Sequence, residues 1–210
     1  MTDEKHTITT SHGHSVNVQT PEPATLVIED VAHALSNLCR FGGHGRRFYS
    51  VAEHSLYTAT LITRRLRALM LEPWCVAGAI AALLHDAAEA YLVDIPRPVK
   101  TLLPMYGELE ARMLEAIRQR FVPWAPNFAA EVKVVDDIML VTEAPQLEID
   151  MANWSAKYQC ITPCDITLSM LTPSEAEPMF LDVYHSLMTK QQQWQAQGMW
   201  SLEDVRYERV

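Results

Sequence analysis

From Ile28 onward, apolar side chains recur at intervals of three and four residues, the spacing of one face of an α-helix. Ile28, Val31, Leu35 and Leu38 define the first such face. Leu109, Met113, Ile117 and Phe121 define a second one, which predicts helices over residues 28–39 and 109–121. Capping signals and runs of apolar residues predict further helices over residues 51–70, 74–91, 128–144 and 173–195. The pattern therefore predicts an all-α fold, organised as one compact helical domain.

Local signals mark the ends of several of these helices. Residues 50–53 (Ser-Val-Ala-Glu) and 172–175 (Thr-Pro-Ser-Glu) have the capping-box pattern, in which a hydroxyl and an acid three residues later satisfy free amides of the first helical turn. The helix predicted over residues 74–91 is apolar nearly all round, which is typical of a buried central helix. The two prolines in residues 94–98 predict a loop directly after it.

The two ends of the chain differ from the helical region in composition. Residues 1–26 are rich in Thr, Ser, Pro and His, and residues 15–18 alternate between polar and apolar, which predicts an extended arm or a small hairpin. Residues 27–196 form the predicted helical domain, and residues 197–210 a C-terminal tail. The arm's histidines are interpreted as polar surface rather than as a metal site; they are His6, His12 and His14.

Composition excludes several classes of protein. The chain has 210 residues, of which 49% are hydrophobic, so it can bury a core, and its formal net charge of −9 is unlike that of proteins that bind nucleic acid polymers. The N-terminus is polar, and the longest apolar run, residues 74–84, is about half of a membrane span. Four cysteines lack a CxxC pair, which favours reduced thiols over a zinc site. We expect a cytoplasmic protein with no membrane partner.

Candidate chemistry comes from polar residues inside apolar helices. His85 and Asp86 close the apolar run, His54 lies in the second predicted helix, and Asp136 lies among valines in the fifth. A buried imidazole or carboxylate needs a partner, and a divalent ion satisfies both groups. Each of these residues alone is more often a hydrogen-bonded core residue. Their order, with His, His-Asp and Asp on separate helices, favours one shared metal site.

The sequence around these residues resembles the HD phosphohydrolase superfamily. The matching segments are Ser-Val-Ala-Glu-His-Ser at 50–55, His-Asp-Ala-Ala-Glu-Ala-Tyr at 85–91, Asp-Ile-Pro-Arg-Pro at 94–98, Val-Thr-Glu at 141–143 and Arg-Phe-Gly-Gly-His at 40–44. They are most similar to the nucleotidase branch, which holds bacterial 5′-deoxynucleotidases and phage dATP triphosphohydrolases. The resemblance covers roughly residues 28–145 and implies an HD-type helical domain.

By position, the resemblance implies that His54, His85, Asp86 and Asp136 ligate a divalent ion. Imidazole and carboxylate together suit Co, Mn, Zn, Ni or Fe, with Mg possible as a second ion. The register of the family places the ligand at Asp136 rather than at its neighbour. The chain departs from the family at that neighbour, Asp137, where a basic residue is frequent.

Two further acids follow His85-Asp86. Glu89 lies on the same helix face, and the resemblance implies that it activates the attacking water as a catalytic residue. The alternative for Glu89 is a solvent-facing helix charge. The resemblance gives Asp94 a contact to the sugar 3′-hydroxyl, whereas the alternative is a turn residue that bonds nearby backbone.

Basic residues near the motifs are candidates for binding phosphate. Arg40 matches an arginine of the family ahead of the first histidine, and Lys100 and Lys133 lie close enough in sequence to reach a phosphate tail. Each has an ordinary solvated charge as its alternative. Further residues that flank the proposed site are Arg46, Arg47, Arg97 and His44.

The function expected from these residues is hydrolysis of a (deoxy)nucleotide, with release of phosphate, pyrophosphate or triphosphate from a dNMP or dNTP such as dATP. The alternative is a non-catalytic module that holds a metal for stability or senses a nucleotide. The sequence also allows a homo-oligomer. The apolar side chains of the last predicted helix, Met179, Val183 and Leu187, can pack either within the domain or between subunits.

Overall fold

The computed structural model describes residues 4–68, 72–125 and 127–198. Within these ranges the chain is mostly helical, with nine α-helices and one two-stranded hairpin. The helices are α1 (Ile28–Asn37), α2 (Val51–Leu66), α3 (Glu72–Leu83), α4 (Glu89–Leu92), α5 (Arg97–Lys100), α6 (Pro104–Phe121), α7 (Ala129–Gln146), α8 (Ala156–Gln159) and α9 (Pro173–Ala196). The hairpin pairs β1 (Thr7–Thr9) with β2 (Ser15–Asn17) in antiparallel register. The predicted all-α class is confirmed, and the N-terminal arm contains a small hairpin.

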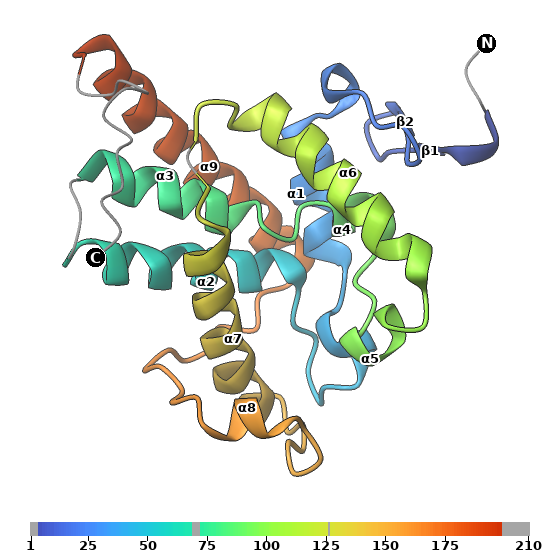
Figure 1. Ribbon diagram of the computed structural model, residues 1–210, viewed down its shortest axis with the longest axis vertical. Helices are drawn as coiled ribbons and strands as arrows, with labels where there is room; N and C mark the ends of the chain where they lie inside the picture. The colour runs from blue at the N-terminus through green and yellow to red at the C-terminus, as the bar shows by residue number, and fades with distance from the viewer. Residues whose placement is uncertain (1–3, 69–71, 126, 199–210) are drawn as a thin grey trace.

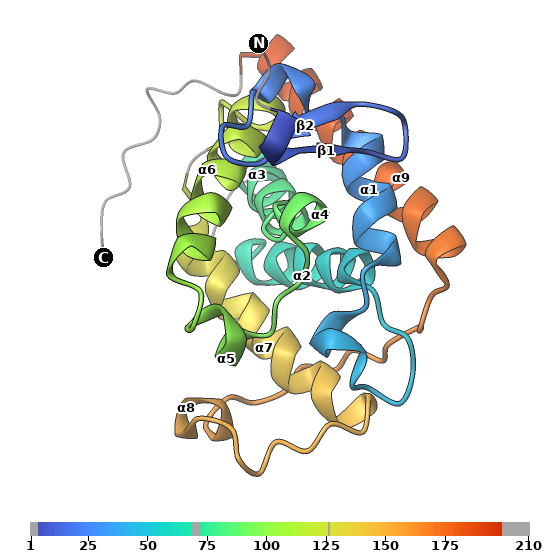
Figure 2. The same cartoon turned by 90° about the vertical axis from the view of Figure 1, so that its right-hand side faces the viewer.

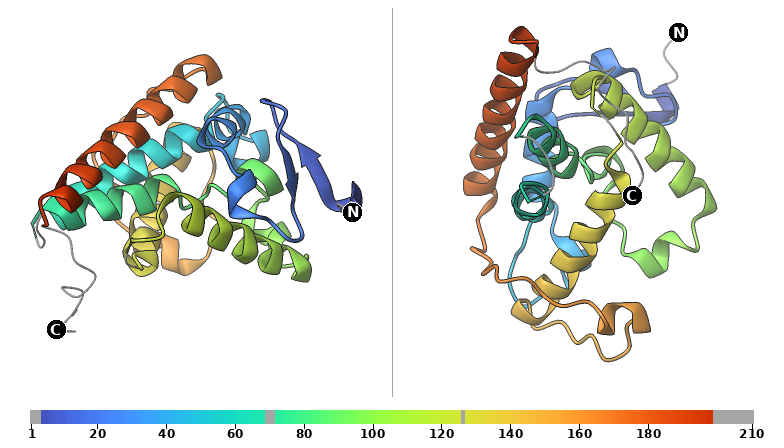
Figure 3. Two further views of the ribbon diagram at one scale, coloured as in Figure 1. Left: turned by 90° about the horizontal axis from the view of Figure 1, so that it is seen from above. Right: turned by 60° about the vertical axis from the view of Figure 1, so that its left-hand side comes forward.

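The helices pack around a central pair. α2 and α3 lie side by side (Figure 1), and α9 runs along one side of this pair, where it contacts α1, α2 and α3 (Figure 3). α7 crosses α2 on another side. The hairpin and α8 lie at opposite ends of the molecule (Figure 2). Side chains from several helices fill the core between these layers, among them Leu35, Ile62, Ile80, Leu83 and Phe180.

The two capping signals have different outcomes. Thr172 and Glu175 form the complete capping box at the start of α9, as predicted. At the start of α2, the Ser50 hydroxyl accepts a hydrogen bond from the Glu53 amide, with a distance of 3.0 Å. The Glu53 carboxylate does not reach back to this turn. It accepts hydrogen bonds from the three backbone amides of residues 169–171, which ties the start of α2 to the segment ahead of α9.

The helix predicted over residues 74–91 is interrupted, so this prediction was wrong. α3 ends at Leu83, and α4 begins at Glu89. Between them the backbone makes tight i to i+3 hydrogen bonds, from the amide of Ala87 to Leu84 and from the amide of Glu89 to Asp86. Apolar composition predicts burial for helix and turn alike and cannot locate such a break. The turn carries His85 and Asp86.

Other boundaries shift by a few residues. α1 ends at Asn37 rather than at residue 39, because Cys39 instead forms a β-bridge with Ser50. α6 begins at Pro104, earlier than predicted, and α7 continues through Pro145. α2 ends at Leu66, with Arg67 as its C-cap, which is earlier than the predicted end at about residue 70. The short helices α5 and α8 were not predicted.

The hairpin is attached to α1 through Asp30. This residue is 3% exposed, and its two carboxylate oxygens accept hydrogen bonds from Nδ1 of His12 and Nδ1 of His14, each with a distance of 2.7 Å. Burial raises the pKa of Asp30, but hydrogen bonds from Thr10, His12 and His14 outweigh it and lower the pKa below its ordinary value. These two histidines therefore join structural elements, a role that the composition of the arm did not indicate.

Candidate metal centre

Four side chains from three segments of the chain converge at one point. His54 lies on α2, His85 and Asp86 lie in the turn after α3, and Asp136 lies on α7. The His54 Nε2 atom is 3.3 Å from His85 Nε2, 3.6 Å from Asp86 Oδ2 and 3.5 Å from Asp136 Oδ1. The His85 Nε2 and Asp86 Oδ2 atoms are 3.0 Å apart. Ligand atoms of His54, His85 and Asp136 all lie within 4.8 Å of one another, so this group can hold a metal ion.

The structure separates the roles of the neighbouring acids Asp136 and Asp137. Asp136 directs one carboxylate oxygen toward His54. The ion pairs of Asp137 are instead with basic side chains, among them Lys133, whose Nζ atom lies 2.7 Å from Asp137 Oδ1. Lys133 also lies 2.7 Å from the second oxygen of Asp136. The geometry is consistent with Asp136 as the ligand, and it places Lys133 at the edge of the centre.

Glu143 orients His54, a role that the sequence analysis missed. Both side chains are completely buried, and the Glu143 Oε1 atom lies 2.6 Å from His54 Nδ1 and 2.8 Å from the Tyr49 hydroxyl, which donates to it. The bond to Nδ1 leaves His54 Nε2 facing the centre, which is the usual arrangement for a metal-ligating histidine held by a carboxylate. The signal in the sequence was an acid between Val141 and Ala144 on an apolar helix, although Val-Thr-Glu was interpreted only as a segment that resembles the family.

Arg40 lies between the buried acids. Its side chain is 9% exposed, and it approaches Glu143 Oε2 at 3.3 Å through Nε and Asp86 Oδ2 at 3.4 Å through Nη1. The contact to Glu143 is an ion pair without hydrogen-bond alignment. Burial lowers the pKa of Arg40, but four carboxylates, led by Glu143 and Asp86, outweigh it and raise the pKa. Arg40 is therefore fixed in the centre by charge.

The carboxylates of the centre carry more negative charge than Arg40 alone neutralises. Burial and the charge of Arg40 lower the pKa of His54, but Glu143 and Asp136 outweigh them and raise it to about 9. Burial raises the pKa of Asp86 and of Asp136, but in both the neighbouring histidines outweigh it and hold the pKa well below the ordinary range. The carboxylates around His54 thus carry negative charge that a divalent cation would compensate. The donor set of two imidazoles and two carboxylates fits such a cation.

Glu89 lies buried beside the centre. It is 4% exposed, and its Oε2 atom has no hydrogen-bond partner among the described residues. Burial and the charges of Asp86 and Asp94 raise the pKa of Glu89 well above its ordinary value, although Arg40 and Lys100 act in the opposite direction. A buried acid with a raised pKa and a free oxygen is suited to exchanging a proton with a bound molecule. The alternative of a solvent-facing charge is wrong for Glu89.

Asp94 and Lys100 flank Glu89. Lys100 Nζ lies 3.5 Å from Glu89 Oε1 and 2.7 Å from Glu110 Oε1, so its charge is shared between two acids. Asp94 is half-buried, and burial raises its pKa, while Arg40 acts to lower it. Both residues therefore contribute charge close to Glu89. Their predicted contacts to substrate stay predictions.

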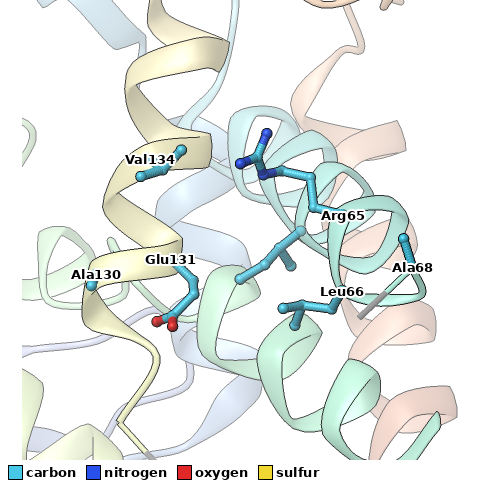
Figure 4. A pocket seen from close by; sticks show the side chains of 7 residues that line it. Arg65, Leu66, Ala68, Ala130, Glu131 and Val134 are labelled. Atoms are coloured by element: carbon cyan, nitrogen blue, oxygen red, sulfur yellow. The ribbon is translucent and has the colours of Figure 1, made fainter. Parts of the chain in front are cut away.

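Among the described residues, three that flank the motifs in sequence have exposed side chains and form no ion pair with the centre. His44, Arg46 and Arg47 are exposed, and Arg46 pairs with Glu148 at 3.7 Å. A pocket of about 470 Å³ opens between the end of α2 and the start of α7 (Figure 4). The side chains that line it, among them Arg65, Leu66 and Glu131, which Figure 4 labels, include none of the four converging residues. This pocket and the group that can hold a metal ion are therefore lined by different residues.

Glu143→Ala should lower the free energy of unfolding by about 3–5 kcal/mol, because it leaves the buried Arg40 and His54 without their shared partner. Urea unfolding followed by circular dichroism at pH 7 measures the loss. Glu131→Ala on the same helix is the matched control, with an expected loss below about 1 kcal/mol because Glu131 acts mainly on the helix dipole. Equal losses in both variants would contradict the assigned role of Glu143.

The pH dependence of this effect has a defined sign. Burial raises the pKa of Glu143, but His54 and Arg40 outweigh it and lower the pKa below its ordinary value. The stability that Glu143 contributes is thus present above its unfolded pKa of about 4.3 and is lost as the pH falls through the lower folded value. The difference between wild type and Glu143→Ala should therefore narrow below about pH 4.

Among the helices of the described ranges, none combines the length and hydropathy that a bilayer span requires. None of the four cysteines, all within the described ranges, forms a disulfide. Val183 and Leu187 pack partly buried against the core, while Met179 is 46% exposed. An oligomer formed through this helix stays a prediction.

Comparison with known proteins gives two relatives of similar length. The uncharacterized protein YfdR of Escherichia coli K12 is 36% identical over 164 residues, which cover 77% of this chain and 84% of the relative. The uncharacterized protein RCAP_rcc00048 of Rhodobacter capsulatus is 32% identical over 187 residues, which cover 84% of this chain and 92% of the relative. No protein-family model matches the sequence.

Proposed function

The chain belongs to the family of Escherichia coli YfdR, whose name assigns no activity, and we propose from its metal centre that it is a divalent-metal-dependent phosphohydrolase acting on (deoxy)nucleotides. The observation that carries this proposal is the convergence of His54, His85, Asp86 and Asp136 from three segments of the chain. Their order also supports membership of the HD phosphohydrolase superfamily, in its nucleotidase branch.

The metal ion would be held by the Nε2 atoms of His54 and His85 and by carboxylate oxygens of Asp86 and Asp136. Co, Mn, Zn, Ni and Fe suit these donors, with Mg as a candidate second ion. When bound, such an ion supplies charge neutralisation at phosphoryl oxygens and favours deprotonation of water. Glu143 keeps Nε2 of His54 directed at the centre through its bond to Nδ1.

The remaining side chains supply a proton acceptor and positive charge. Glu89 places an unpartnered carboxylate oxygen beside the centre, where it can take a proton from the attacking water and return it to the leaving group. Arg40 is fixed next to Asp86 and can bind a phosphoryl oxygen. Lys100 keeps a positive charge next to Glu89, and Asp94 would bind the sugar 3′-hydroxyl.

A panel of nucleotides tests the proposal. The purified protein, stripped with a chelator and reloaded with Mn, Co, Ni or Zn, is incubated with deoxynucleoside mono- and triphosphates, and the products are separated by chromatography. We expect at least one deoxynucleotide to release phosphate, pyrophosphate or triphosphate, with activity lost in the chelated protein and restored by metal. A protein that binds metal and nucleotide but forms no product with any ion would contradict the proposal and favour the non-catalytic alternative.

A further inference from the structure

Three basic side chains from separate helices gather at one edge of the metal centre. Arg97 begins α5, Lys133 lies on α7 and Lys157 lies on α8. All three pair with Asp137, at 3.6 Å from Arg97 Nη1, 2.7 Å from Lys133 Nζ and 3.4 Å from Lys157 Nζ. We call these three residues the basic rim.

The basic rim adjoins the metal centre through Asp136. One oxygen of this carboxylate lies 3.5 Å from His54 Nε2, while the other lies 2.7 Å from Lys133 Nζ and 3.7 Å from Arg97 Nη2. An anion held on the rim is therefore separated from the metal centre by the width of a single carboxylate. A chain of linked phosphates can span that separation.

The rim carries more charge than its acids neutralise. Three cations face Asp136 and Asp137, and Asp136 also faces the metal centre. The rim side chains are about half exposed, at 51% for Arg97, 48% for Lys133 and 51% for Lys157, so they are open to an anion from solvent. Without Asp137, like charges would repel one another across this edge, and its carboxylate keeps them together.

Tyr158 fixes the outer part of the rim. This residue is 8% exposed, and Arg97 donates a hydrogen bond to its hydroxyl. The guanidinium of Arg97 lies 5.8 Å from the ring centroid of Tyr158, and Lys157 Nζ lies 4.5 Å from it. Cation–π contacts of this kind hold a charge in place without neutralising it. Arg97 and Lys157 are thus positioned before any ligand binds.

We propose that Arg97, Lys133 and Lys157 bind the distal phosphates of a nucleoside triphosphate, with Asp137 as a positioning residue. The proposal rests on the proposed function and narrows its substrate class from nucleotides in general to triphosphates. A monophosphate at the metal centre meets Arg40 and Lys100 and leaves the rim without a ligand. A triphosphate places its additional negative charge where the additional cations lie.

Binding of inorganic anions to the metal-free protein tests the rim without requiring catalysis. Isothermal titration calorimetry compares tripolyphosphate with orthophosphate in wild type, Lys157→Met and the control Lys190→Met, an exposed lysine on α9. We expect wild type to bind tripolyphosphate at least tenfold more tightly than orthophosphate. Lys157→Met should weaken tripolyphosphate binding about fivefold and leave orthophosphate unchanged, and Lys190→Met should change neither. The effect of Lys157→Met should shrink at high salt.

Steady-state kinetics then tests whether the basic rim binds the nucleotide substrate. With a metal that supports turnover, Lys157→Met should raise KM for the deoxynucleoside triphosphate about fivefold and leave KM for the matching monophosphate unchanged. The proposed role of the basic rim would be wrong if wild type bound the two inorganic anions equally. It would also be wrong if Lys157→Met left the affinity for tripolyphosphate unchanged. Selective tripolyphosphate binding in a protein that hydrolyses no nucleotide would support the rim and contradict the proposed function, so the two failures are distinguishable.

Discussion

Asp86→Ala should abolish nucleotide hydrolysis and release the metal. Asp86 is central to the site, because its Oδ2 atom lies 3.0 Å from His85 Nε2 and 3.6 Å from His54 Nε2. Loss of a partner that only orients a ligand already lowers metal affinity about 10- to 100-fold, and loss of a ligand should lower it further. Metal content after dialysis, measured by mass spectrometry, and product formation from the nucleotide panel follow the two effects separately.

The control for Asp86→Ala is Asp165→Ala. Asp165 is an exposed acid ahead of Ile166, so its removal should change neither metal content nor rate. Circular dichroism verifies that Asp86→Ala is folded. Should the folded variant keep its metal and full activity, the assignment of the metal centre would be wrong.

Glu89→Gln should lower kcat by about 100- to 10,000-fold, the usual contribution of a general base, while metal content is retained. The amide keeps the size of the side chain but cannot accept the proton. Glu108→Gln, which changes an exposed glutamate on α6, is the matched control and should keep the wild-type rate. Steady-state kinetics with the best substrate measures the loss, and an unchanged kcat in Glu89→Gln would remove Glu89 from the mechanism.

Glu89→Gln should also raise the free energy of unfolding of the metal-free protein. Burial and the charges of Asp86 and Asp94 raise the folded pKa of Glu89 above its unfolded value. Stability from this group is therefore present below the unfolded pKa of about 4.3 and is lost as the pH rises through the folded pKa. Glutamine does not ionise, so the advantage of Glu89→Gln in free energy of unfolding should grow with pH. Urea unfolding at pH 5 and pH 8 measures this difference.

Glu89→Gln is thus expected to lower kcat and to raise the free energy of unfolding, and the two changes together identify the role of Glu89. A residue that destabilises the folded protein and accelerates the reaction is expected at a functional site. A variant that lost both activity and stability would instead indicate a structural role for Glu89.

The sequence predicted well those features that depend on spacing along one segment. Apolar periodicity located α1 and α6, because a helix buries one face at every third or fourth residue, and the capping box located the start of α9. The anomaly of polar residues in apolar helices located His54, His85 and Asp136, because a buried polar group needs a partner. Both arguments use information that is local in the chain.

Features that depend on contacts between distant segments were missed. The break after Leu83 is set by tertiary packing, since its residues are as apolar as those of a continuous helix. The partners of Glu53 and Glu143 lie 116 and 89 residues away in sequence, so neither periodicity nor motif spacing could identify them. The basic rim likewise combines helices that begin at residues 97, 129 and 156.

The bond of Glu53 to the distant segment has a consequence during protein synthesis. Glu53 directly precedes His54 in the sequence, and its carboxylate accepts hydrogen bonds from the backbone amides of Ser169, Met170 and Leu171. Until these three amides have left the ribosome, the first turn of α2 lacks the hydrogen bonds to Glu53. His54, which lies in this turn, is synthesised long before them. A nascent chain that ends before residue 169 should therefore hold His54 on a helix start that is not yet anchored.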